Sequence, residues 1–245
     1  MTRSRVFQAI PLQKGEEVTL TLAASHHIAR VLRARTGDQL TLFNGQGGEY
    51  LATIIKVDKK QVTVQLIAYL PKETESPIAI SLAQGISRGE KMDYIIQKSV
   101  ELGVKTLVPI VAERTQVRLN AERSQKRMQH WQSIIESACE QCGRNQLPVL
   151  APPIASYQWL QSGSSIGSLR LVLSPYAKQT LRTLALPSNA QVSVLIGPEG
   201  GLSEQEIALA NQQGFISLSL GPRILRTETA AIAAISAIQT HFGDM

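Results

Sequence analysis

The chain has 245 residues, enough for one large domain or two of ordinary size. With 43% hydrophobic and 18% charged residues, its composition is that of a globular protein and excludes an intrinsically disordered chain. No apolar run reaches the roughly 20 residues that cross a bilayer, and no signal peptide is evident, so we expect a cytoplasmic protein without a membrane partner. The net charge is +6, and residues 1–71 carry 9 Lys and Arg against 5 Asp and Glu. This basic N-terminal region is compatible with a polyanionic partner.

The first 70 residues predict a small β-barrel with one helical insert. Short runs rich in Val, Ile, Thr and Leu alternate with turn signals, including the glycine cluster at residues 45–48. Between the first two runs, Ser25 is positioned to cap a short helix that carries two histidines and two arginines. The predicted strands span residues 18–22, 39–43, 50–57 and 61–70.

The polar segment between Pro71 and Pro77 has no periodicity and is the predicted linker. We therefore place a first domain at residues 1–71, a linker at 72–77 and a second domain at 78–245. The second domain alternates between strand and helix patterns, which is typical of an α/β fold with a mostly parallel sheet. Its predicted strands span residues 78–84, 106–111, 169–173, 192–196 and 215–220, and its predicted helices span 91–102, 124–142, a segment that begins at Ser203, and 229–242.

The two cysteines, Cys139 and Cys142, form a single C-x-x-C pair. A structural zinc site needs four ligands, and no second Cys/His pair lies at ligand spacing. A thioredoxin-like motif would open a helix after a strand, whereas this pair lies late in a helical pattern. We therefore expect two helix-face residues and no metal.

Two glycine-rich loops follow successive predicted strands of the second domain. Residues 197–201 read Gly-Pro-Glu-Gly-Gly, and residues 221–229 begin with Gly-Pro and then carry two arginines and a glutamate. Taken alone, either loop is as often an ordinary turn as a ligand site. Neither has the Lys-Ser/Thr of a P-loop, and the first lacks the spacing of a dinucleotide fingerprint. Because ligands of open α/β sheets bind at the carboxyl ends of strands, the pairing of the loops favours a binding site.

These loops carry a resemblance to a known family. Residues 196–201 (Ile-Gly-Pro-Glu-Gly-Gly) and residues 220–230 (Leu-Gly-Pro-Arg-Ile-Leu-Arg-Thr-Glu-Thr-Ala) resemble the ribosomal RNA small subunit methyltransferase E family, which belongs to the trefoil-knot (SPOUT) methyltransferases. The resemblance continues through residues 27–33, 98–104 and 140–144, so it covers nearly the whole chain in the right order. It implies an α/β protein with an N-terminal PUA-like β-barrel and a C-terminal trefoil-knot domain, assembled as a homodimer.

The activity that the resemblance implies is methylation of uridine N3 in the decoding region of small-subunit rRNA, with S-adenosyl-L-methionine as the cofactor. The partner is then small-subunit rRNA or the 30S particle. Two alternatives stay open. One is a non-catalytic rRNA-binding or assembly protein; the other is an enzyme of the same fold that methylates another base or a ribose 2′-hydroxyl. The small residues of the predicted last helix, which allow close helix packing, agree with the expected homodimer.

By resemblance and position, Arg226 is the first candidate to stabilise the uracil anion, because its guanidinium is permanently charged and forked. Arg223 is the second candidate, and Glu228 is expected to orient the arginine or to accept the proton. A structural alternative is an ion pair between Arg226 and Glu228. The family often has His where this chain has Ser174, which can form hydrogen bonds but cannot act as an imidazole base.

Two further sets of residues complete the expected site. The residues expected to wrap the cofactor are Leu173, Ile196, Gly197, Pro198, Glu199, Gly200, Leu220, Gly221, Ile224 and Leu225. The arginines expected to contact RNA are Arg3, Arg5, Arg30, Arg33, Arg35 and Arg144.

Overall fold

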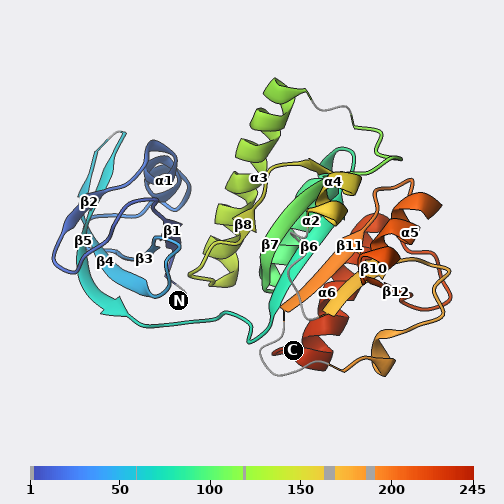
Figure 1. Ribbon diagram of the computed structural model, residues 1–245. Coiled ribbons are helices and arrows are strands. Elements are labelled where there is room, and N and C mark those ends of the chain that lie inside the picture. Colours follow the sequence, from blue (N-terminus) through green and yellow to red (C-terminus); the bar gives the residue numbers. More distant parts are fainter. Residues whose placement is uncertain (1–2, 59, 118–119, 163–168, 186–190) are drawn as a thin grey trace. The chain divides into compact units, whose positions relative to one another are not determined.

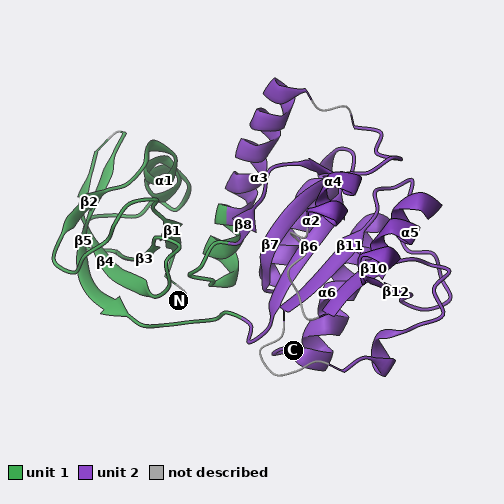
Figure 2. Ribbon diagram, in the orientation of Figure 1, with its two compact units in different colours: residues 1–75, 136–147 green, residues 76–135, 148–245 purple. Residues whose placement is uncertain are grey.

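The computed structural model describes residues 3–58, 60–117, 120–162, 169–185 and 191–245. The chain divides into two compact units, shown in two colours in Figure 2. Unit 1 comprises residues 1–75 and 136–147, and unit 2 comprises residues 76–135 and 148–245. The structure groups residues 136–147 with unit 1. The sequence pattern places them in the second domain, at residues 78–245. Among the described residues, no helix combines the length and the apolar character needed to cross a membrane.

Unit 1 is built on a curled five-stranded sheet (Figure 1). The strand order is β1-β3-β4-β5-β2, with β1 parallel to β3 and the other neighbours antiparallel. Inward-facing side chains such as Val6, Leu42, Ile54 and Val64 form its apolar core. Strand β1 was not predicted from the sequence, because three residues are too few to show an alternating pattern. The elements are β1 (Arg5–Phe7), β2 (Glu17–Thr19), α1 (Leu22–His26), η1 (His27–Val31), β3 (Gln39–Phe43), β4 (Glu49–Val57) and β5 (Val62–Leu70).

The helical insert of unit 1 begins earlier than the sequence pattern predicts. The capping residue is Thr21, whose Oγ1 accepts a hydrogen bond from the Ala24 amide at 3.3 Å. The prediction that Ser25 caps the helix is wrong, because Ser25 is buried inside it. The Ser25 hydroxyl donates to the Leu20 carbonyl at 3.2 Å and accepts from the Val62 amide at 3.0 Å. It therefore ties the helix to strand β5.

A group of ion pairs holds residues 136–147 within unit 1. Arg5 pairs with Glu49 and donates a second hydrogen bond to Asn145 Oδ1 at 2.7 Å. Arg144 is 4% exposed and donates two hydrogen bonds to Glu75, at 2.8 and 2.5 Å. Buried charges are tolerated where they are paired in this way.

Unit 2 contains a seven-stranded sheet whose pairings are all parallel. The strand order is β12-β10-β11-β6-β7-β8, and β9 also pairs with β7. Successive residues of β11 are buried, so both faces of the sheet are covered, as expected for a parallel sheet. The strands are β6 (Ala79–Gly85), β7 (Val104–Val111), β8 (Val149–Leu150), β9 (Ile154–Ala155), β10 (Leu169–Leu173), β11 (Gln191–Ile196) and β12 (Ile216–Leu218).

The helices of unit 2 cover this sheet (Figure 1). Trp159 of α4 and Phe215 pack together, with ring centroids 5.7 Å apart, in a core shared with Val172 and Leu195. The Ser203 capping box predicted from the sequence is present at the start of α5. The helices that lie wholly in unit 2 are α2 (Glu90–Glu101), α4 (Ser156–Gln161), η2 (Leu181–Thr183), α5 (Glu204–Gln212) and α6 (Thr227–Phe242), and α3 (Ala121–Cys142) belongs to unit 2 up to residue 135.

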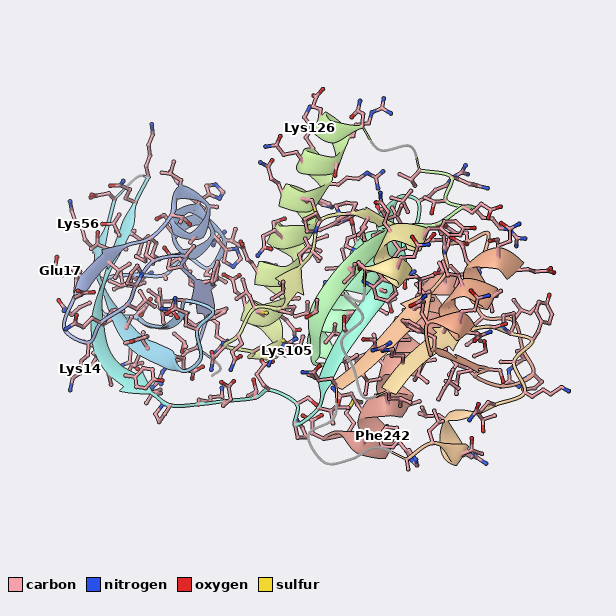
Figure 3. All side chains as sticks on the ribbon, in the orientation of Figure 1. Lys14, Glu17, Lys56, Lys105, Lys126 and Phe242 are labelled. Atoms are coloured by element: carbon pink, nitrogen blue, oxygen red, sulfur yellow. The ribbon has the colours of Figure 1, made fainter. Side chains whose placement is uncertain are left out.

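Two details of the helices concern residues singled out in the sequence. Helix α6 begins at Thr227, two residues before the predicted start, so Glu228 lies in its first turn. Near the end of α3, burial raises the pKa of the Cys139 thiol to about 12, which keeps the thiol protonated and unreactive. Elsewhere, charged side chains extend outward from their elements, as Figure 3 shows for Lys56 of β4 and Lys126 of α3.

Candidate active site at the carboxyl edge of the parallel sheet

A pocket of about 400 Å³ lies at the carboxyl ends of the strands of unit 2. Its walls come from the loops that follow β10, β11 and β12, together with Lys91 of helix α2 and Arg114 of the segment that follows β7. Five parallel strands therefore deliver side chains to one place, as the rule for open α/β sheets predicts. All ten residues expected to wrap the cofactor line this pocket.

The first glycine loop requires glycine because backbone segments approach closely. A Cβ atom at Gly85, the last residue of β6, would lie 2.3 Å from the Pro198 nitrogen. A Cβ atom at Gly197 would lie 2.7 Å from the Leu202 nitrogen. The loop closes with a hydrogen bond from the Gly201 amide to the Pro198 carbonyl at 2.8 Å. A side chain at either Gly85 or Gly197 would therefore push the loop away from strand β6 or distort the loop itself.

A buried hydrogen-bonded chain joins this loop to the start of the last helix. Gln84 Nε2 donates to the Thr227 hydroxyl at 2.9 Å, and the Thr227 hydroxyl donates to the Gly197 carbonyl at 2.7 Å. Both side chains are buried. The end of β6, the glycine loop and the first residue of α6 are thereby fixed relative to one another.

A second buried group, Glu206 of α5, holds segments close to the pocket. Its carboxylate accepts hydrogen bonds from the amides of Ser203 and Glu113, at 2.8 and 3.0 Å, and from the Ser156 hydroxyl at 2.5 Å. The residue next to Glu113 is Arg114, whose Nη1 donates to the Gly200 carbonyl at 3.3 Å. The N3 glutamate of the α5 capping box thus also holds the segment that carries a pocket arginine.

The two candidate catalytic arginines, Arg223 and Arg226, line the pocket and are exposed. Arg226 occupies the N-cap position of α6 with an extended backbone. The ion pair with Glu228 that was the structural alternative is not among the ion pairs of the described residues. Two exposed cations at the entrance of one pocket can meet developing negative charge on a ligand.

Glu228 instead interacts with Lys91, a residue that sequence reasoning missed. Lys91 Nζ lies 3.9 Å from Glu228 Oε2 and 3.8 Å from Glu199 Oε1. Glu228 does not line the pocket, and its buried Oε2 accepts no hydrogen bond from the described residues. Glu199 Oε1 also accepts the Arg88 amide at 2.9 Å. The wall of the pocket therefore contains an ammonium shared by two carboxylates.

The strand-end rule that selected the glycine loops also applies to Lys91 and Arg114. Lys91 lies six residues after strand β6, and Arg114 lies three residues after β7. Neither segment contains a Gly-Pro pair, so the glycine-loop pattern that predicted the other pocket residues does not predict Lys91 and Arg114. Listing the charged residues after every predicted strand would have found both.

The arginines expected to contact RNA fall into two groups. Arg3, Arg30, Arg33 and Arg35 are exposed on unit 1. Arg5 and Arg144 are instead engaged by the carboxylates that fix residues 136–147. Because the guanidinium groups of Arg5 and Arg144 are largely buried and already paired, we keep the RNA-contact proposal for the exposed group.

The pocket fits a nucleoside cofactor of the expected kind. Its volume lies within the range of small-molecule sites. The lining combines apolar side chains such as Ile196, Leu220 and Leu225 with glycine backbone and a few charged groups. Apolar walls suit an adenine ring, and the glycine-rich backbone offers hydrogen-bonding groups at close range.

Family models identify both halves of the chain. The RNA methyltransferase domain matches residues 74–239, and the RNA methyltransferase PUA domain matches residues 20–67. The chain is 39% identical over 241 residues to the ribosomal RNA small subunit methyltransferase E of Buchnera aphidicola subsp. Schizaphis graminum, covering 98% of this chain and 97% of that one. It is 32% identical over 243 residues to the Bacillus subtilis protein of the same name, covering 96% and 95%.

Solved structures show the same likeness over the full length of both chains. The ribosomal RNA small subunit methyltransferase E from Neisseria gonorrhoeae, bound to S-adenosyl methionine, has a TM-score of 0.91 and 37% identity, and the alignment covers 100% of each chain. A Legionella pneumophila protein, solved with the bound cofactor SAM, has a TM-score of 0.95 and 45% identity, again over 100% of each chain.

A parallel sheet that gathers two Gly-Pro loops and three arginines at one pocket, in a chain that also carries a PUA-type unit, defines an RNA methyltransferase of the SPOUT (trefoil-knot) class. The fold class expected from the sequence is confirmed. Within this class, the chain belongs to the ribosomal RNA small subunit methyltransferase E family.

Proposed function

We propose that this protein transfers a methyl group from S-adenosyl-L-methionine to N3 of one uridine in the decoding region of small-subunit rRNA. The observation that carries the proposal is the pocket itself, where the cofactor-type glycine loops and Arg226 border the same space. Relatives of the same family have been solved with S-adenosyl methionine bound, which supports the choice of cofactor.

Arg226 is the residue to which we assign stabilisation of the uracil anion. Bound S-adenosyl-L-methionine supplies an electrophilic methyl group on a sulfonium. Loss of the N3 proton leaves a negative charge spread over N3 and the two carbonyl oxygens of the ring, and this anion would take the methyl group and leave S-adenosyl-L-homocysteine. The guanidinium of Arg226 can donate two parallel hydrogen bonds to such an anion. Its fixed place at the start of α6 means that little reorganisation is needed.

Glu228 is the proposed final acceptor of the N3 proton, which would reach it by relay through Lys91, because Lys91 lines the pocket and Glu228 does not. Its Oε2 has no hydrogen-bond partner among the described residues, so a lone pair is available. Lys91 holds this carboxylate and Glu199 together and keeps an ammonium at the pocket wall. Because Glu199 already accepts the Arg88 amide, Glu228→Gln is expected to slow methyl transfer more than Glu199→Gln.

Rates of methyl transfer test the assignment of Arg226. Arg226→Lys keeps the charge but loses the fork, so single-turnover methylation should slow by roughly 100-fold, while cofactor affinity changes little. Methylation at N3 removes a base-pairing donor, so a reverse-transcription stall at the modified uridine reports the product. Arg182→Lys, an exposed arginine outside the pocket, is the matched control and should behave like wild type. An Arg226→Lys variant as fast as wild type would remove Arg226 from the mechanism.

Mass spectrometry of nucleosides from small-subunit rRNA, with and without the protein, tests the reaction as a whole. N3-methyluridine that depends on the protein supports the proposal. A different methylated nucleoside would favour the enzyme of the same fold that acts on another atom, and RNA binding without any new nucleoside would favour a non-catalytic assembly protein. We also propose a homodimer, for which sedimentation should give about twice the 26.7 kDa of one chain.

A further inference from the structure

The two most exposed large apolar side chains of the described residues both line the pocket. Tyr176 is 84% exposed and Ile224 is 76% exposed. Single exposed apolar residues are common on protein surfaces and need no explanation. Here, however, the two side chains with the greatest exposure line the same pocket. Tyr176 lies on the loop after β10 and Ile224 on the loop after the neighbouring strand β12. This coincidence points to a ligand that covers them.

Tyr176 also differs from the other four tyrosines in its contacts. The rings of Tyr50 and Tyr69 pack together, with centroids 5.1 Å apart. The Tyr94 ring lies 5.7 Å from Lys98 Nζ, and the Tyr157 hydroxyl contacts Glu113 at 3.4 Å. No hydrogen bond, ring contact or ion pair engages the Tyr176 side chain within the described parts of the chain. Its ring and hydroxyl are both available.

The backbone that carries Tyr176 is nevertheless firmly held. The Ser174 amide donates to the Leu218 carbonyl at 2.9 Å, and the Ser219 amide donates to the Gln179 carbonyl at 3.0 Å. Between these two anchors, the Ala177 amide donates to the Ser174 carbonyl at 3.2 Å and closes a turn. Tyr176 therefore projects from a turn that is fixed at both ends to strand β12 and the residue after it. An aromatic ring on such a support loses little entropy when it is covered.

We propose that Tyr176 and Ile224 form a nucleobase-binding site at the mouth of the pocket, which receives an unstacked base of the RNA substrate. This inference rests on the proposed function and specifies how the target base is held. Proteins read single-stranded RNA by stacking splayed bases on aromatic rings. A base that undergoes chemistry must leave its stack and enter a pocket, and an apolar side chain beside the ring helps to retain it.

The charges at the pocket favour RNA as the occupant. Arg223 and Arg226 are exposed at the same entrance, and Arg114 is exposed on the segment after β7. An aromatic ring that shares a pocket with arginines matches a base joined to its phosphates, because the guanidinium groups can bind the phosphates while the ring stacks on the base. An apolar protein partner would instead require these cations to lose water without compensation.

RNA affinity and cofactor affinity together test the site. Tyr176→Phe keeps the ring and should leave the RNA dissociation constant within about twofold of wild type. Tyr176→Ala should weaken RNA binding, and raise KM for RNA, by about tenfold or more, the size expected for one stacked base. Calorimetric affinity for S-adenosyl-L-methionine should stay unchanged. Tyr94→Ala removes an exposed tyrosine outside the pocket and is the matched control.

A fluorescent variant gives a second, independent measurement. Both native tryptophans, Trp131 and Trp159, are buried, so a tryptophan introduced by Tyr176→Trp would be the exposed emitter. Addition of a short uridine-containing RNA should quench its emission, because bases stack on the indole. S-adenosyl-L-methionine alone should leave this emission unchanged.

Each contrary outcome has a distinct meaning. Loss of cofactor affinity in Tyr176→Ala would show that the ring covers the cofactor, and a change of sedimentation would show that it packs against a second copy; either result overturns the inference. Equal RNA affinity of Tyr176→Ala and wild type would overturn it as well. Failure of the proposed function is recognised separately, because wild-type protein would then produce no N3-methyluridine.

Discussion

Thr227→Val is the sharpest test of how the glycine loop is held, because it removes a hydroxyl without changing the shape of the side chain. The substitution deletes the hydrogen bonds to Gln84 Nε2 and to the Gly197 carbonyl. At about 1 kcal/mol for each net hydrogen bond, the free energy of unfolding should fall by about 2 kcal/mol. For a chain of this size, that corresponds to a decrease in Tm of about 4–8 °C.

The size of this loss depends on which hydrogen bonds Gln84 and the Gly197 carbonyl keep in the variant. Gln84 Nε2 retains the Gly85 carbonyl at 3.0 Å, so it does not become an unsatisfied donor. The Gly197 carbonyl retains only Gln84 Nε2, at 3.4 Å. The loop therefore loses its shortest restraint, and cofactor affinity should fall together with stability. Thr227→Ser keeps the hydroxyl and should recover most of both.

Denaturation in urea, followed by tryptophan fluorescence, reports this change directly. Trp131 and Trp159 both belong to unit 2, so the signal follows the unit that carries the pocket. Calorimetry with S-adenosyl-L-methionine then measures the affinity of the same samples. If Thr227→Val unfolds at the same urea concentration as wild type, the hydrogen-bonded chain contributes nothing to stability and the reasoning is refuted.

Three further variants test other parts of the molecule. Gly221 has a φ of +114°, and no heavy atom lies within 4 Å of a Cβ added there, so Gly221→Ala should cost about 1 kcal/mol or more through the backbone alone and weaken cofactor binding in calorimetry; equal affinity would contradict this. Reversal of Arg30 and Arg33 to Glu should weaken RNA binding and flatten its salt dependence by about one to two units of log–log slope, and a wild-type slope would exclude phosphate contacts. Burial raises the pKa of Glu140, whose carboxylate accepts the Phe7 amide, so its ionisation costs stability as the pH rises above 4.5. Glu140→Gln should therefore raise the Tm at pH 7 relative to wild type and show little difference in acid, and an identical shift at both pH values would contradict this origin.

The longer elements could be predicted from the sequence because their periodicity is strong. The strands over residues 39–43 and 169–173 have the predicted bounds, and the capping box at Ser203 identified the start of α5. The three-residue strand β1 and the two-residue strands β8 and β9 lie below the length at which alternation is visible. Ser25 was misassigned as a cap because its neighbours look like a helix start, whereas its hydroxyl is used in a long-range contact with β5.

The site was predictable where glycine marked it and not where only a charge did. All ten residues expected around the cofactor border the pocket because both Gly-Pro loops follow parallel strands. Lys91 and Arg114 reach the pocket from segments whose local sequence is unremarkable in composition. Arg144 looked like an RNA contact, yet its burial depends on Glu75, a residue 69 positions away that no local pattern connects to it.

The positions of the pocket-lining residues in the chain determine when the cofactor site is complete during synthesis. The lining runs from Lys91 to Ala230, so the binding site has no complete form in any chain that stops before the final helix. During synthesis, N-terminal segments emerge and fold first. The newly made protein therefore has no complete cofactor site until Ala230 has been added. Because the lining comes from the loops after five strands, a cofactor bound there would stabilise the folded unit by an amount that rises with cofactor concentration.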